Sequence, residues 1–153
     1  EIMASLSAPA NVYTTAGNPV TAAAAMATLD VIETEKLVAR SERIGNFAKA
    51  FFEKAAKRYD FIGDVRMYGL NGGIDIVDSQ GQPDDEATTK LIYRIFELGA
   101  IMISLRGNTL RFQPPLVITQ AALESAFAMI SQAFSELEAG QLTLPETDNH
   151  IGW

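Results

Sequence analysis

The sequence contains no cysteine, a single histidine and no cluster of basic residues. Without cysteine, disulfides, thiolate nucleophiles and cysteine-ligated metal sites are excluded. Lysine and arginine together number 12 against 19 acidic residues, and the formal charge of -7 argues against nucleic acid, whose phosphates bind grouped positive charge. No apolar run approaches the roughly 18 residues of a transmembrane helix. We therefore expect a soluble, cytoplasmic protein with neither a nucleic-acid nor a membrane partner.

Two helices are predicted in the first part of the chain. Asn18 is a good N-cap and Pro19 suits the first helical position, so the alanine-rich run Val20 to Glu33 should be helical. Thr34 is then expected to cap a second helix that ends near Tyr59. Its apolar positions recur at helical spacing: Leu37, Ile44, Phe47, Ala48, Phe51 and Ala55. This spacing indicates that the phenylalanines of the stripe pack in a core.

The period changes to that of a strand after the second helix. Ile62 to Val77 reads as two strand segments around a glycine-rich bend. These glycines do not match a phosphate-binding loop, because no helix follows them to supply its N-terminal amides. A bulge or a close approach of backbones explains them better. Asp84 and Asp85 should then begin a third helix, which Gly99 ends.

The remaining segments complete a sheet and a final helix. Ala100 to Leu105 and Thr109 to Gln113 are predicted strands, and the tight connection between them favours antiparallel pairing. Thr119 is expected to cap the last long helix, which runs to Gly140. This order predicts an α+β fold: a two-layer small domain whose three- to four-stranded, largely antiparallel sheet is covered by helices on one face.

Arg111 is the unusual residue of the predicted strands, because it places a permanent charge in a run that is otherwise apolar. The guanidinium presents a rigid fork of donors that fits a carboxylate with two parallel hydrogen bonds. Spacing alone leaves two interpretations open. In one, Arg111 faces solvent or pairs with a structural acidic residue; in the other, it binds the carboxylate of a ligand.

No catalytic constellation is complete in the sequence. Ser41, His150 and the scattered carboxylates have no spacing that joins them into a triad or a metal site. From the residues alone, the function stops at a domain that binds a small molecule or a protein partner.

Four motifs nevertheless carry a resemblance to a known family. They are Thr14-Thr15-Ala16-Gly17-Asn18-Pro19, Ile62-Gly63-Asp64-Val65-Arg66, Gly72-Gly73-Ile74-Asp75 and Leu110-Arg111-Phe112-Gln113-Pro114-Pro115-Leu116. In this order and spacing the chain resembles the C-terminal part of class III aminotransferases, which are pyridoxal-phosphate enzymes of fold type I. The group includes 4-aminobutyrate and ornithine aminotransferases. Several segments look most like the branched-chain amino-acid (isoleucine) 2-epimerases of the same family.

The resemblance implies a division of the chain and roles for three residues. Residues 1–33 would be the tail of the large cofactor domain and a long interdomain helix, and residues 34–153 the C-terminal small domain. Family members are dimers that share their active sites. Thr14, or less favourably Thr15, would reach the cofactor phosphate of the neighbouring subunit, and Arg111 would hold the substrate carboxylate. Met67 departs from the family, which usually has glycine there, so the pocket near that strand is expected to differ.

The resemblance also implies what the chain lacks. By the resemblance, the family's lysine that bonds to pyridoxal phosphate and the aspartate that pairs with its pyridine nitrogen would both lie upstream of Glu1. The lysines of this chain, Lys36, Lys49, Lys54, Lys57 and Lys90, are expected on helical faces away from any such motif. The chain would then be a C-terminal fragment with no catalytic residue of its own and inactive alone. The complete enzyme is expected to transaminate an amino acid of the 4-aminobutyrate type with a 2-oxo acid as a homodimer. The alternatives are branched-chain amino-acid epimerisation and a non-catalytic binding domain.

Overall fold

The computed structural model describes residues 17–144. The chain separates into two compact units, residues 1–37 and 38–153, and each is considered by itself. In the first unit, α1 (Pro19–Thr34) begins as the sequence predicts, since the side-chain oxygen of Asn18 accepts hydrogen bonds from the backbone N–H groups of Val20 and Thr21. Within residues 17–144, no side chain of α1 is buried, although the helix is rich in alanine.

Thr34 does not cap a second helix, and that prediction is wrong. It is the last residue of α1, and its hydroxyl donates back to the carbonyl of Asp30 at 2.7 Å. Threonine makes this bond within a helix as readily as it caps one. The next helix begins after a short connection in which Lys36 takes a left-handed conformation with φ of 51°.

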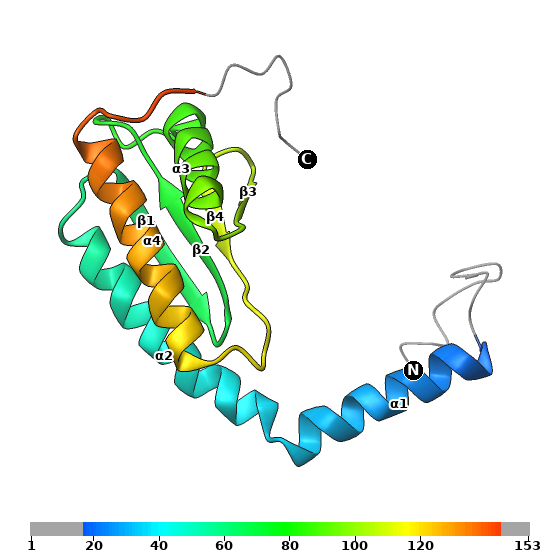
Figure 1. The fold of residues 1–153 in the computed structure, drawn as a ribbon. Helices are drawn as coiled ribbons and strands as arrows, with labels where there is room; N and C mark the ends of the chain where they lie inside the picture. The colour runs from blue at the N-terminus through cyan, green and yellow to red at the C-terminus, as the bar shows by residue number, and fades with distance from the viewer. Residues whose placement is uncertain (1–16, 145–153) are drawn as a thin grey trace, which may run out of the picture. The chain divides into compact units, whose positions relative to one another are not determined.

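The second unit is built on one antiparallel sheet. The remaining elements are α2 (Leu37–Ala56), β1 (Ile62–Tyr68), β2 (Asn71–Ile76), α3 (Asp85–Leu98), β3 (Ile103–Leu105), β4 (Thr109–Phe112) and α4 (Gln120–Glu138). The four strands pair in the order β1-β2-β4-β3, and every pairing is antiparallel. The helices α2, α3 and α4 lie on one side of this sheet (Figure 1). The two-layer α+β prediction is confirmed.

The core lies between the sheet and the three helices. The strands contribute alternate residues, as a half-buried sheet requires. The fully buried side chains include Phe52, Leu91, Ile95, Leu123, Ile130, Phe134, Ile74, Ile76 and Leu110. Phe52 sits edge-on to Phe112 of β4, with 5.3 Å between ring centres, and so joins α2 to the strand that carries Arg111. This contact fixes β4 against the helical layer.

The turn between β1 and β2 packs directly on α2. Gly69 takes a φ of 57° in this turn, and the backbone N–H of Leu70 donates to the hydroxyl of Ser41 at 3.0 Å. Gly45, one helical turn after Ser41, is buried, and a Cβ atom at this position would overlap the backbone of Gly69. The helix and the turn therefore approach at a distance that only glycine permits.

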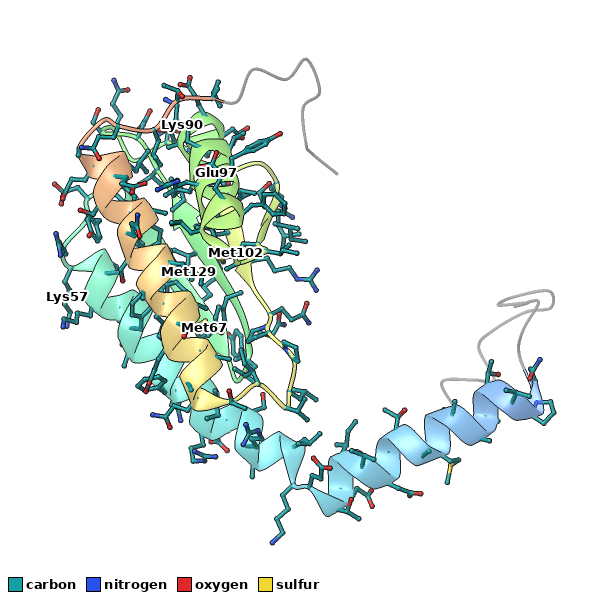
Figure 2. The ribbon with its side chains drawn as sticks, in the orientation of Figure 1. Lys57, Met67, Lys90, Glu97, Met102 and Met129 are labelled. Atoms are coloured by element: carbon teal, nitrogen blue, oxygen red, sulfur yellow. The ribbon has the colours of Figure 1, made fainter. Side chains whose placement is uncertain are left out.

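Met67 and Gly72 face each other across the β1–β2 pair, on the helical side of the sheet. A Cβ atom on Gly72 would collide with the sulfur of Met67, which packs against the core (Figure 2). The close contact at Gly72 is with a side chain, and the close approach of backbones that the sequence predicts is found instead at Gly69, which meets Gly45 of α2. Met67 fills space beneath the sheet, so its departure from the family pattern does not alter the face that carries Arg111.

Candidate functional site

The candidate site is the face of the sheet that the helices leave uncovered. Side chains alternate along each strand, and Leu110 and Phe112 of β4 enter the core. Thr109 and Arg111 consequently lie on the opposite, open face, and both are half-buried. The same alternation places charged residues of β1 and β2 beside them, because each strand turns its polar residues away from the helices.

The register of the strands aligns two arginines on the open face. Gly73 of β2 lies opposite Arg66 of β1 on one side and opposite Arg111 of β4 on the other. Neighbouring strands are ~4.8 Å apart, so the two arginine backbones are separated by roughly 10 Å across a residue without a side chain. In the next row, Asp75 of β2 lies opposite Asp64 and Thr109.

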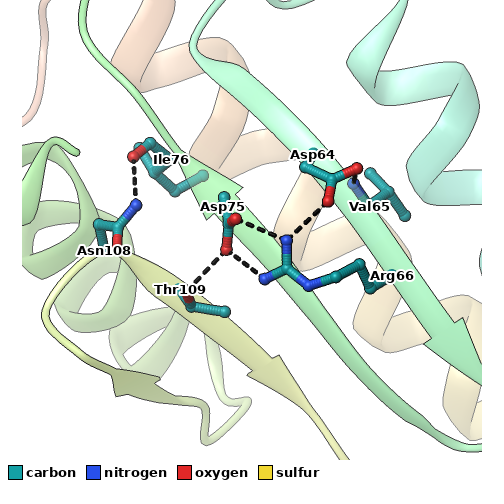
Figure 3. Close-up of polar contacts among 7 residues, drawn as sticks. All are labelled: Asp64, Val65, Arg66, Asp75, Ile76, Asn108 and Thr109. Carbon is teal, nitrogen blue, oxygen red and sulfur yellow. Dashed lines mark hydrogen bonds and ion pairs between the residues drawn. The ribbon is translucent and has the colours of Figure 1, made fainter. Parts of the chain in front are cut away.

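One of the two arginines is fully engaged (Figure 3). The Nη2 of Arg66 donates to Asp75 Oδ1 at 2.6 Å, and its Nη1 donates to Asp75 Oδ2 at 2.6 Å and to Asp64 Oδ2 at 2.7 Å. The hydroxyl of Thr109 also donates to Asp75 Oδ1, at 2.7 Å. The carboxylates of Asp64 and Asp75 lie opposite each other on neighbouring strands and would repel each other. The guanidinium of Arg66 binds both and so offsets this repulsion.

This network shifts the titration of Asp75. The hydrogen bonds from the Arg66 guanidinium are the main cause that holds the pKa of Asp75 below its ordinary value, and the Thr109 hydroxyl acts in the same direction, while partial burial opposes both. The hydrogen bonds to Asp75 and Asp64 likewise raise the pKa of Arg66. Arg66 and Asp75 therefore both carry their charges at neutral pH.

A pH titration of stability should reveal the Asp75 network. Because its pKa is lowered in the folded chain, Asp75 stabilises the fold above the unfolded pKa of ~3.9 and loses this contribution as the pH falls through the folded value. We expect Asp75→Asn to reduce the free energy of unfolding by about 1 kcal/mol at pH 6. The difference should shrink toward zero in urea titrations at successively lower pH; a constant difference down to pH values below ~2 would contradict the assignment.

Arg111 is placed differently from Arg66. No side chain or backbone oxygen of the described residues accepts a hydrogen bond from its guanidinium. The residue also lines a cavity of about 330 Å³ whose other walls are mainly apolar and include Phe112 of β4 and Leu123 and Ile130 of α4. A half-buried cation that has no partner among the described residues is suited to bind an anionic group of a ligand.

Two residues that the sequence did not single out hold the ends of the Arg111 strand. Asn108, just before β4, donates from its side chain to the carbonyl of Ile76 at 3.1 Å and accepts through its backbone from the Ile76 N–H at 2.8 Å. After β4, Arg40 of α2 donates to the carbonyls of Leu116 and Ile118. Neither contact could be predicted from the spacing of residues in the sequence, because each joins residues that are distant in the chain.

The other predicted site residues lie elsewhere. Thr14 and Thr15 fall outside the residues that the structure describes. Lys49 and Lys54 belong to α2 and Lys90 belongs to α3, but Lys36 and Lys57 lie in turns just before and just after α2, so the prediction that all five are on helices is wrong for these two (Figure 2 labels Lys57 and Lys90). Lys49 pairs with Glu53 and Lys90 with Glu86, each along its own helix. None of the five is on a strand.

The described part of the chain also lacks two other kinds of site. Residues 17–144 contain no group of three or more acidic or histidine side chains placed to hold a metal ion. Their helices are too short or too polar to cross a membrane. Arg111 and its surroundings are therefore the strongest candidate for ligand binding within these residues.

Comparison with known proteins adds to this geometry. Residues 1–134 match the family model "Aminotransferase class-III". The chain is 50% identical to an isoleucine 2-epimerase of Lentilactobacillus buchneri, over 100% of this chain and 34% of that protein. It is 41% identical to an alanine/serine racemase of Pyrococcus horikoshii, over 84% of this chain and 28% of that protein. The chain thus spans about a third of the length of these relatives.

A solved structure shares the fold. The acetylornithine aminotransferase of Elizabethkingia anophelis superimposes with a TM-score of 0.74 and 35% sequence identity, over 88% of this chain and 34% of that one. The antiparallel sheet with its helical layer is therefore an architecture that known enzymes also contain.

Proposed function

Because the chain belongs to the class III aminotransferase family, whose members depend on pyridoxal phosphate, we propose that it is the C-terminal, substrate-binding part of an enzyme that acts on the amino group of an amino acid. Arg111 binds the substrate carboxylate. The observation that supports this role is the half-buried guanidinium of Arg111, which has no hydrogen-bond partner among residues 17–144, in a residue that also lines an apolar cavity. A carboxylate accepts two parallel hydrogen bonds from such a group, which fixes both position and orientation.

Amino-acid epimerisation or racemisation is the reaction we place first for the complete protein. The reason is the 50% and 41% identity to an epimerase and a racemase, against 35% to an aminotransferase. Transamination of a 4-aminobutyrate-type substrate with a 2-oxo acid is the second candidate, since aminotransferases at 34–36% identity also match this chain. Both reactions begin with the same substrate carboxylate on Arg111.

The cofactor is bound mainly by parts of the complete protein other than residues 34–153. When bound, pyridoxal phosphate supplies an electron sink that makes the hydrogen on the substrate α-carbon acidic. The contribution of residues 34–153 is to orient the substrate through Arg111 and to cover it from water. Residues 1–33 belong to the large domain and the interdomain helix, and Thr14 or Thr15 contacts the cofactor phosphate across a homodimer in the cytoplasm.

An assay with one amino acid separates the two reactions. We expect the complete protein with pyridoxal phosphate to convert L-isoleucine into its 2-epimer without any 2-oxo acid, as measured by chiral chromatography. If the amino acid changes only after a 2-oxo acid is added, and the amino group appears on that acid, the protein is an aminotransferase. The isolated 153-residue chain should be inactive in both assays. Failure of the complete protein in both assays, with L-isoleucine and again with 4-aminobutyrate and a 2-oxo acid, would refute the proposal.

A further inference from the structure

We propose that Asp75 is a specificity-determining residue: it keeps the guanidinium of Arg66 occupied, so that the open face of the sheet offers a ligand one carboxylate receptor, Arg111, instead of two. This inference rests on the proposed role of Arg111. It concerns residues of this sheet only, and it predicts that this part of the protein receives a monocarboxylate end of the substrate and no second acidic group.

The two arginines are arranged as a pair of receptors would be. They flank Gly73 in one row of the sheet, at a backbone separation of roughly 10 Å. Gly73 itself adds no side chain between them, and the space above it is bordered by the Thr109 methyl group and the Nη2 of Arg66, which lie 2.9 Å and 3.5 Å from the position of an added Cβ atom. A five-carbon dicarboxylate carries a carboxylate at each end and has a length comparable to this backbone separation.

Asp75 occupies the hydrogen-bond donors of one of these two arginines, Arg66. Its carboxylate takes both terminal nitrogens of Arg66 in a bidentate pair, with both donor–acceptor distances at 2.6 Å. Asp64 accepts one further bond from Nη1. A fork that is already filled by two carboxylates has little to gain from a third, because the incoming group would have to displace an existing ion pair and would face their negative charge.

Asp75 is also kept away from Arg111. One of its oxygens accepts from Arg66 and from the hydroxyl of Thr109, and the other accepts from Arg66. Thr109 lies two residues before Arg111 on the same face of β4. The carboxylate is thus saturated on the side where Arg111 lies, and Arg111 keeps its donors for a ligand.

The test measures the binding of two simple probes, glutarate and valerate, to the complete protein by calorimetry. Both have five carbons, and only glutarate has a second carboxylate. We expect Asp75→Asn to increase the preference for glutarate, defined as the Kd of valerate divided by the Kd of glutarate, about five-fold, the effect of one additional partly exposed ion pair. Because asparagine keeps one acceptor, Asp75→Ala serves as a second variant and should give an equal or larger increase.

Asp64→Asn is the matched control. It removes the same charge from the same face but leaves the bidentate pair between Arg66 and Asp75 intact. We expect its preference for glutarate to change less than two-fold. In the double variant Asp75→Asn with Arg66→Gln, the increase should disappear, since the second receptor is gone. Circular dichroism would verify that each variant is folded.

The outcomes separate this inference from the proposed function. An unchanged preference in both Asp75 variants, or an increase of equal size in Asp64→Asn, would overturn the role of Asp75, as would an increase that survives in the double variant. The role of Arg111 is tested independently by Arg111→Gln, which should weaken the binding of valerate and so raise its Kd. If Arg111→Gln leaves valerate binding unchanged, the proposed function fails, whatever the Asp75 variants show.

Discussion

Replacing Arg111 by glutamine in the complete protein should raise the KM for its amino-acid substrate by roughly 30- to 150-fold, because hydrogen bonds to a charged group contribute about 2–3 kcal/mol. Glutamine keeps much of the shape of the side chain but has neither the charge nor the fork of donors. The affinity for pyridoxal phosphate should be unchanged, since no described residue near Arg111 resembles a cofactor anchor. Steady-state kinetics and a titration of the apoenzyme with cofactor measure the two effects.

Two further variants sharpen the Arg111 test. Arg111→Lys keeps the charge but presents a point cation, and it should recover only part of the affinity. Arg43→Gln removes a charge from an exposed position of α2 and should change the KM less than two-fold. Equal losses of substrate and cofactor affinity in Arg111→Gln would instead indicate a general disturbance of the fold. A KM that does not change would assign Arg111 to a structural role.

Gly45→Ala is expected to destabilise the fold by about 3 kcal/mol, although glycine-to-alanine changes inside helices ordinarily stabilise them by up to ~1 kcal/mol. The reversal arises because the added methyl group would overlap the backbone carbonyl of Gly69 in the β1–β2 turn. Backbone atoms cannot rotate aside as a flexible side chain can, so α2 or the turn must move. Ser41 would then lose its hydrogen bond to Leu70, which is 3.0 Å long.

Asn46→Ala provides the matched comparison for Gly45. Asn46 is the next residue of α2 and is exposed, so alanine there adds helix propensity without a collision. We expect this variant to be slightly more stable than the parent in urea titrations followed by circular dichroism. If Gly45→Ala also gained stability, the close approach of α2 to the turn would be wrong.

Much of the fold followed from local chemistry. Asn18 and Thr119 cap their helices as predicted, and the side chain of Thr119 accepts from the N–H of Ala122. Gly99 ends α3 in a left-handed conformation. These signals could be recognised because a cap or a C-terminal glycine acts on backbone groups within one helical turn.

The periodicity of α2 was less informative about which side faces the core. Phe47 belonged to the predicted stripe but is 41% exposed, whereas Phe52, which the stripe omitted, is fully buried. Phenylalanines at 47, 51 and 52 lie on adjacent faces of one helix, and spacing cannot rank them. Only the position of β4 and α4 decides, since Phe52 packs on both Phe112 and Phe127.

The candidate site was predictable only in part. Arg111 stood out as a charge in an apolar strand, but the sequence could not say whether an acidic residue was opposite. The answer depends on the strand order β1-β2-β4-β3, which puts Gly73 beside Arg111 and directs Asp75 toward Arg66. Register between strands that are distant in the chain is set by tertiary packing, and no local pattern encodes it.

The strand order also determines how the protein avoids fibrous association. β1 and β3 are the outer strands of the described sheet, and a long, regular outer strand is a template on which another molecule can extend the sheet. β3 has only three residues, and β1 has an irregular register between Ile62 and Asp64. β1 also carries the charged pair Asp64 and Arg66. The charged pair of Asp64 and Arg66 on β1 thus also protects an exposed edge from aggregation.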